Sequence, residues 1–144
     1  MTPIAPAVHT LVVDDKASHR NALLLTLERL GHETREAATV EAALELLRAM
    51  RFDLVITDME LPHALGEPAR MECGLEVIRA ARAVDPDSVV LAITGYATVE
   101  NAVLAMQEGA ADYIHKGASL ADLRARLEQV LATRKPRREP QGEN

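Results

Sequence analysis

The sequence predicts an α/β domain in which a parallel sheet carries helices on both faces. Short apolar runs alternate strictly with helical patterns, five of each, and the apolar runs are continuous rather than alternating. Strands covered on both sides need such continuous runs. Strict alternation of strand and helix favours parallel pairing through right-handed crossovers. The length of 144 residues suits one domain of ordinary size.

The five predicted strands are short apolar segments, at 11–13, 33–37, 54–56, 89–93 and 113–114. Capping residues and apolar spacing place the five helices at Ser18 to Gly31, from Thr39, at Gly74 to Ala83, at Thr98 to Gly109 and from Ser119. Residues 59–73 form the one long connection. Apolar residues at helical spacing are expected in the core, including Val99, Val103 and Met106.

Composition excludes several classes of protein. A net charge of −6 and 2% aromatic residues argue against nucleic-acid binding by this domain. The one cysteine, Cys73, excludes an internal disulfide framework and a multi-cysteine zinc site. No apolar run approaches the roughly 20 residues of a membrane helix, and the N-terminus does not resemble a secretory signal. We therefore expect a cytoplasmic domain without a membrane partner.

The ends of the chain differ in composition from its body. Residues 134–144, RKPRREPQGEN, are basic, contain proline and lack apolar periodicity. We expect an N-terminal tail at 1–8, the domain at 9–133, and a disordered basic tail or the start of a linker at 134–144.

Chemistry-bearing residues follow four of the five predicted strands: Asp14, Asp15, Asp58, Thr94 and Lys116. The carboxyl ends of parallel strands meet at one edge of a sheet, where ligands bind. Three carboxylates placed together repel unless a cation joins them, and oxygen ligands suit Mg²⁺. A nearby ammonium and hydroxyl suit the oxygens of a phosphoryl group in transfer. Asp58, the lone acid of the central strand, is predicted to be the nucleophile.

Three segments carry a family resemblance: VVDD (12–15), VITDMELP (55–62) and ITGYATVENAVLAMQEGAADYIHK (93–116). Together they resemble the receiver domain of bacterial two-component response regulators, and the third is most similar to receivers of enhancer-binding transcription activators. The resemblance implies a flavodoxin-like three-layer sandwich whose doubly wound, five-stranded parallel sheet has the order 2-1-3-4-5.

The resemblance also implies a phosphoacceptor and a metal site. Asp58 matches the phosphoacceptor aspartate of the family. Asp15 matches the direct Mg²⁺ ligand, and Asp14 matches the neighbouring acid that holds the ion through water. Glu60 stands where the family supplies a backbone carbonyl to the metal.

Further positions match the switch of the family. Thr94 corresponds to the hydroxyl that moves onto the phosphoryl group, and Tyr113 to the aromatic residue that turns inward behind it. Lys116 corresponds to the lysine that pairs with phosphoryl oxygens. Glu60 and Tyr96 flank this site and are expected to tune the lifetime of the phosphoryl group.

Partners and output are also implied by the resemblance. The donor would be a sensor histidine kinase or a phosphotransfer protein. The output face would be formed by the helix at 98–109, the strand at 113–114 and the helix from 119, with a possible homodimer through the same face. The domain would be a self-phosphorylating, autodephosphorylating switch in transcription regulation and not a metabolic enzyme.

The chain departs from the family pattern twice. Asp58 and Gly74 are sixteen residues apart, about twice the usual spacing, because of an extended loop at 63–73. Gly117 follows Lys116 where the family usually has proline, so no cis peptide bond is expected there.

Three other interpretations remain open. A degenerate receiver would signal by partner binding without phosphorylation. A small aspartate-nucleophile phosphatase would use Glu60 as a second acid. A flavodoxin-like nucleotide binder would need a glycine-rich phosphate loop, which does not follow the first strand. Of the other reactive residues, Cys73 and His63 are expected to be inert, and His115 is expected to point away from the site and receives no role.

Overall fold

The computed structural model describes residues 7–134, so most of both predicted tails lies outside the described residues. The predicted fold class and strand order are confirmed, because five parallel strands form one sheet of order β2-β1-β3-β4-β5. The strands are β1 (His9–Val13), β2 (Glu33–Ala37), β3 (Leu54–Asp58), β4 (Val89–Thr94) and β5 (Asp112–His115). The helices are α1 (Ala17–Arg29), α2 (Val40–Ala49), α3 (Met71–Val84), α4 (Val99–Glu108) and α5 (Leu120–Ala132).

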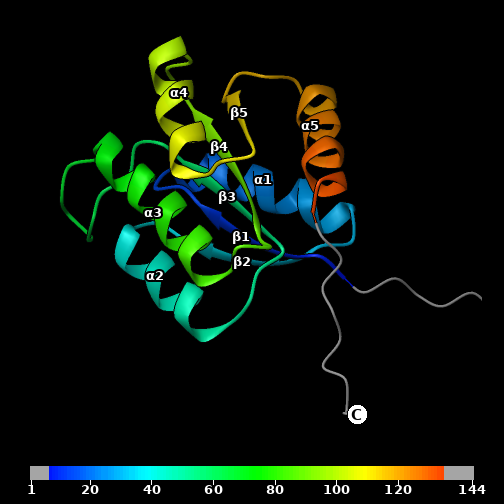
Figure 1. Cartoon of the computed structure of the whole chain (residues 1–144), viewed down its shortest axis with the longest axis horizontal. Helices are drawn as coiled ribbons and strands as arrows, with labels where there is room; N and C mark the ends of the chain where they lie inside the picture. The colour runs from blue at the N-terminus through cyan, green and yellow to red at the C-terminus, as the bar shows by residue number, and fades with distance from the viewer. Residues whose placement is uncertain (1–6, 135–144) are drawn as a thin grey trace, which may run out of the picture.

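The sheet forms the middle of three layers. Figure 1 shows α1 and α5 on one side of the sheet and α2, α3 and α4 on the other. Side chains of β1 alternate between the two sides: Val12 packs with α1 and α5, whereas Leu11 and Val13 pack with α2 and α3. Each side therefore has its own apolar core. The central strands β3 and β4 are buried along their whole length, as their continuous apolar runs predict.

Three of the predicted helix caps are confirmed. The side-chain oxygens of Thr39, Thr98 and Ser119 each accept a hydrogen bond from the backbone N–H three residues later. The prediction for α1 is wrong, because its N-cap is Lys16 and Ser18 lies in the first turn. The β1–α1 loop is shorter than predicted, so α1 begins directly beyond the end of β1.

The third helix also begins earlier than predicted, at Met71 rather than near Gly74. Gly74 is not a helix start but a point of close approach. A Cβ atom there would lie 2.6 Å from the Cα of Met59 and closer still to its carbonyl group. Only glycine lets α3 pack this tightly against the backbone that follows β3.

The long connection therefore covers 59–70. Its base is held on α2, because the carbonyls of Pro62 and His63 accept hydrogen bonds from the first two backbone N–H groups of that helix. Leu61 and Arg70 form an antiparallel bridge across the base. Residues 65–70 of the connection are exposed, and Leu65 is 87% exposed.

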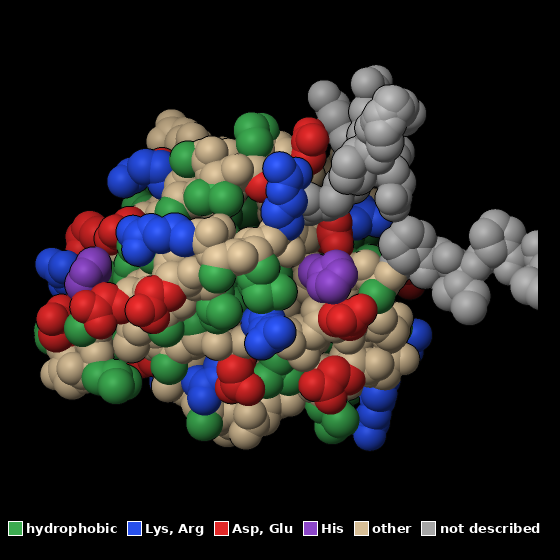
Figure 2. Space-filling view, turned by 90° about the horizontal axis from the view of Figure 1, so that it is seen from below, with side chains coloured by type: hydrophobic (Ala, Val, Ile, Leu, Met, Phe, Trp, Pro, Cys, Tyr) green, Lys and Arg blue, Asp and Glu red, His purple; other side chains and the backbone are tan. Residues whose placement is uncertain are grey.

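The predicted burial of one face of α4 is wrong. Val99, Val103 and Met106 are 76%, 47% and 46% exposed, and within α4 only Ala105 is buried. Ala105 packs into the apolar core with residues of β4 and α3, whereas the larger apolar residues of α4 face outward. On the face drawn in Figure 2, by contrast, acidic and basic side chains are interspersed with apolar ones. No helix among residues 7–134 is long and apolar enough to cross a membrane.

Candidate functional site

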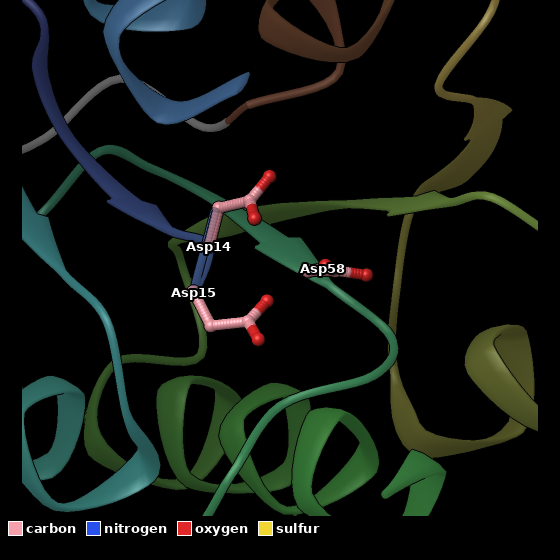
Figure 3. A group of neighbouring side chains, drawn as sticks. All are labelled: Asp14, Asp15 and Asp58. Atoms are coloured by element: carbon pink, nitrogen blue, oxygen red, sulfur yellow. The ribbon is translucent and has the colours of Figure 1, made fainter. Parts of the chain in front are cut away.

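Three carboxylates meet at the carboxyl edge of the sheet. Asp14 and Asp15 follow β1, and Asp58 ends the adjacent strand β3 (Figure 3). One oxygen from each lies within 4.8 Å of the others. Asp14 and Asp58 are buried, at 2% and 5% exposure, whereas Asp15 is exposed. We refer to these three residues as the acid cluster.

Lys116 joins the acid cluster from the turn after β5. Its Nζ donates a hydrogen bond to Asp58 Oδ2 at 2.7 Å and lies 3.3 Å from Asp14 Oδ2. The backbone N–H of Lys116 donates to the carbonyl of Thr94 at 2.7 Å, which fixes the turn beside β4. Glycine after Lys116 therefore does not displace the ammonium group from the site. No peptide bond in the described residues is cis.

The electrostatics of the site favour an added positive charge. Burial raises the pKa of Asp58 above its ordinary value, and nearby Asp14 adds to the rise, although Lys116 and the N–H of Glu60 oppose it. Burial alone would lower the pKa of Lys116, but the carboxylates of Asp58 and Asp14 raise it overall. Three carboxylates against one ammonium leave two negative charges when all four groups are ionised.

The acid cluster fits a hard divalent cation. Carboxylate oxygens are the ligands that Mg²⁺ takes, and its two charges match the two left unbalanced here. Asp14 Oδ1 is fixed by the backbone N–H of Lys16 at 2.9 Å, and Asp58 Oδ1 by that of Glu60 at 3.1 Å. These bonds hold the buried acids in position while the exposed Asp15 completes the group. The three carboxylates together therefore form a suitable site for such an ion.

Thr94 and Tyr113 are linked through the loop between β4 and α4. Thr94 is buried at the end of β4, and its Oγ1 accepts a hydrogen bond from the N–H of Tyr96 at 3.0 Å. The half-buried Tyr113 donates its hydroxyl to the carbonyl of Tyr96 at 2.9 Å. The side chain of Tyr96 is 69% exposed. Both predicted switch residues thus contact one loop backbone. Thr94 ends β4, the neighbour of the strand that ends at Asp58, and Tyr113 lies on β5, one strand further away.

Two residues of α1 were not found by sequence reasoning. His19 Nδ1 lies 3.3 Å from Lys116 Nζ. Arg20 donates to the carbonyl of Asp14 at 2.7 Å and to Glu36 Oε1 at 2.7 Å, which secures the loop that carries the acids. Both residues lie near the start of α1, which begins at the sheet edge where the acids lie. Their position in the sequence, shortly after Asp14 and Asp15, is the feature from which their proximity to the site could be inferred.

The remaining reactive residues lie outside the acid cluster. His63 Nδ1 is 3.9 Å from Glu76 Oε1 on α3. Cys73 is buried in α3, where the guanidinium of Arg70 lies 3.9 Å from its sulfur. Neither residue belongs to the acid cluster, so both stay without a role in the site.

Comparison with known proteins places this geometry in a family. The model of the response regulator receiver domain matches residues 10–128. The transcriptional regulatory protein ZraR of Escherichia coli K12 is 36% identical over 125 residues, which cover 87% of this chain and 26% of that protein. This chain spans about a quarter of the length of the first curated relatives that it matches.

Two solved structures share the fold. One is a response regulator of Burkholderia pseudomallei with a phosphorylated aspartic acid, a calcium ion and citrate. It is 30% identical with a TM-score of 0.74, covering 88% of this chain and 69% of that one. The other is the beryllofluoride-activated receiver domain dimer of NtrC4. It is 27% identical with a TM-score of 0.75, covering 87% of this chain and 97% of that one.

Proposed function

The chain belongs to the response regulator receiver family, and from that premise we propose that it is a switch that accepts a phosphoryl group on Asp58. Receivers are signalling switches and not metabolic enzymes. The observation that carries the proposal is the position of the Lys116 ammonium, 2.7 Å from the buried Asp58 carboxylate and beside two further acids. A nucleophile, a cationic partner for phosphoryl oxygens and a cation site would then lie within one small volume.

The acid cluster would hold the metal ion. Asp15 and Asp58 would bind Mg²⁺ directly, Asp14 would bind it through water, and the backbone carbonyl of Glu60 would complete the protein ligands. When bound, the ion neutralises charge on the phosphoryl oxygens and on the acids themselves.

The proposed reaction is an in-line displacement. A carboxylate oxygen of Asp58 attacks the phosphorus of a phosphohistidine, and the bond from phosphorus to the donor nitrogen breaks as the new O–P bond forms. The electron pair returns to the donor imidazole, and Asp58 becomes an acyl phosphate. Lys116 pairs with a phosphoryl oxygen and so exchanges one anionic partner for another. Hydrolysis of the acyl phosphate by water resets the switch, at a rate tuned by Glu60 and Tyr96.

The switch would act through the Tyr96 loop. If Thr94 Oγ1 turns to the phosphoryl group, it gives up its hydrogen bond to the N–H of Tyr96. Tyr113, which bonds the carbonyl of the same residue, would then move inward. The change would reach α4, β5 and α5. We call the exposed apolar residues of these elements the output face: Val99, Val103, Leu104, Met106 and Leu120.

A receiver implies a histidine kinase partner, and we propose a sensor histidine kinase or a phosphotransfer protein as the donor. We further propose that the output face binds an effector or a second copy of the domain, in a cytoplasmic pathway of transcription regulation. The receiver dimer of NtrC4 and the regulator ZraR support this assignment by similarity. We take the domain to occupy 9–133, with 1–8 and 134–144 as tails.

A phosphatase or a nucleotide binder would need room for its substrate. The cavity beside Lys116, between α1 and α5, has a volume of about 130 Å³. Small-molecule sites are usually about 300 Å³ or larger. Asp14 lines this cavity but Asp58 does not, so the cavity does not form a substrate pocket over the proposed nucleophile.

Intact mass tests the proposal. The wild-type protein is incubated with Mg²⁺ and acetyl phosphate beside an Asp58→Asn control. One added phosphoryl group in the wild type and none in the control is the expected result. Absence of an adduct with both acetyl phosphate and phosphoramidate would refute the proposal and favour a degenerate receiver.

A further inference from the structure

The ring of His115 bridges the two loops that carry Lys116 and Thr94. Its Nδ1 lies 3.0 Å from the backbone nitrogen of Gly117, in the turn after β5. Its Nε2 lies 3.1 Å from the carbonyl oxygen of Gly95, directly after β4. His115 is exposed at the end of β5, where strand alternation gave it no role.

Both contacts are satisfied by a single form of the ring. A backbone N–H can only donate, so Nδ1 must present its lone pair to Gly117. A carbonyl can only accept, so Nε2 must carry the hydrogen that bonds Gly95. The neutral tautomer protonated at Nε2 makes both bonds at once, and neither the other tautomer nor the imidazolium can do so.

Gly117 is suited to this arrangement in two ways. It supplies the N–H that the ring accepts, which a proline in its place would lack. It also leaves room for the ring, because a Cβ atom at 117 would lie 3.0 Å from both Cε1 and Nδ1 of His115. The glycine after the lysine is therefore matched to the histidine before it.

The bonded groups flank the functional side chains. His115 and Gly117 are the two neighbours of Lys116, and Gly95 follows Thr94. His115 also pairs with Thr94 in the sheet, and the N–H of Lys116 donates to the Thr94 carbonyl at 2.7 Å. The ring thus adds one bond between these segments, at Gly95, and one within the Lys116 turn, at Gly117.

We propose that His115 is a positioning residue that holds the Lys116 turn against the Thr94 loop, and so keeps the ammonium group over Asp58. This proposal rests on the proposed function, because its consequence is the rate at which Asp58 is phosphorylated. His115 touches neither Asp58 nor a phosphoryl group and acts through the backbone on either side of Lys116.

Phosphorylation by acetyl phosphate with Mg²⁺ tests the role through matched variants. His115→Phe keeps a ring but loses both bonds, and we expect phosphorylation about 5- to 25-fold slower, since one hydrogen bond corresponds to about fivefold. The side chain of His115→Asn can accept a hydrogen bond from the Gly117 N–H in an Asx turn. We therefore expect this variant to be phosphorylated about fivefold faster than His115→Phe. His63→Phe, which alters a half-buried histidine outside the site, should match the wild type.

The same assay separates positioning from general destabilisation. In a Lys116→Ala background, His115→Phe should cause no further slowing, and His115→Phe alone should leave the melting temperature near that of the wild type. The proposal is overturned if His115→Phe reacts at the wild-type rate, if His115→Asn is as slow as His115→Phe, or if the losses multiply in the Lys116→Ala background.

A second measurement does not depend on phosphorylation. Nitrogen NMR of the wild-type protein should show His115 as the neutral tautomer protonated at Nε2, with the Gly117 amide exchanging more slowly than in His115→Phe. A hydrogen on Nδ1, or equal exchange in both proteins, would refute the bridge itself. If wild-type protein accepts no phosphoryl group while the bridge is present, the proposed function fails and the structural part of the inference stands.

Discussion

Substitution of Gly74 by alanine should destabilise the domain and disturb the acid cluster together. Alanine in α3 gains about 0.5–1 kcal/mol of helix stability over glycine. Its Cβ, however, would lie 2.6 Å from the Cα of Met59, so helix and backbone must separate by about 1 Å to reach ordinary contact. Overpacking of this kind costs about 1–3 kcal/mol, and the upper end applies because the obstacle is backbone. The net loss should be about 2 kcal/mol.

The disturbance should reach the site because Met59 lies between α3 and the cluster. The N–H of Met59 donates to the carbonyl of Ile93 on β4 at 2.9 Å, and the next residue, Glu60, donates to Asp58 Oδ1. Thermal melting should show a decrease of about 8 °C, at about 4 °C per kcal/mol for this size. Phosphorylation of Asp58 should also slow. Gly95→Ala, where a Cβ meets nothing within 4 Å, is the control for stability. Wild-type stability in Gly74→Ala would refute this reasoning.

Three other perturbations have defined outcomes. Burial, together with the positive charge of Arg134, lowers the pKa of His32 below its ordinary value of 6.5. The unfolded chain therefore binds a proton at His32 more readily than the folded chain does. The free energy of unfolding from urea titrations should therefore decrease as the pH falls through about 6.5, and this slope should be shallower in His32→Gln; equal slopes would contradict the assignment. Mg²⁺ at ten times its Kd should stabilise the wild type by about 1.4 kcal/mol in thermal melts but should not stabilise Asp15→Asn. Equal stabilisation of both proteins by Mg²⁺ would exclude Asp15 as a ligand. Without metal, Lys116→Ala should lower the free energy of unfolding by about 1–3 kcal/mol, because it leaves Asp58 without its ammonium partner. Unchanged urea midpoints would show that the ion pair does not stabilise the fold.

The convergence of Asp14, Asp58 and Lys116 could be predicted from sequence for a simple reason. Parallel strands with short connections leave their carboxyl ends at one edge, so residues placed after each apolar run are brought together whatever the loops do. The helix caps Thr39, Thr98 and Ser119 are predictable because capping depends only on local sequence. A hydroxyl at the N-cap can accept a hydrogen bond from the free backbone N–H three residues later.

What the sequence did not predict depends on contacts between distant segments. Periodicity identifies an apolar face of α4 but not whether anything covers Val103. The sequence pattern predicts a helix start at Gly74, but glycine is required there by the close approach of the Met59 backbone. Strand alternation predicts that His115 points to the face opposite Lys116. It cannot show that the ring meets the Gly95 carbonyl, because that contact depends on how β4 and β5 end side by side.

Whether phosphorylation of Asp58 alters the output face can be decided with amide NMR spectra. Spectra of uniformly ¹⁵N-labelled protein would be recorded with Mg²⁺ before and after addition of acetyl phosphate, with Asp58→Asn as the control. We expect wild-type shifts at Asp58, Thr94 and Lys116 that continue through Tyr113 into α4, and none in the control. Phosphorylation confirmed by mass, with shifts confined to the residues around Asp58, would contradict the assignment of this domain as a switch.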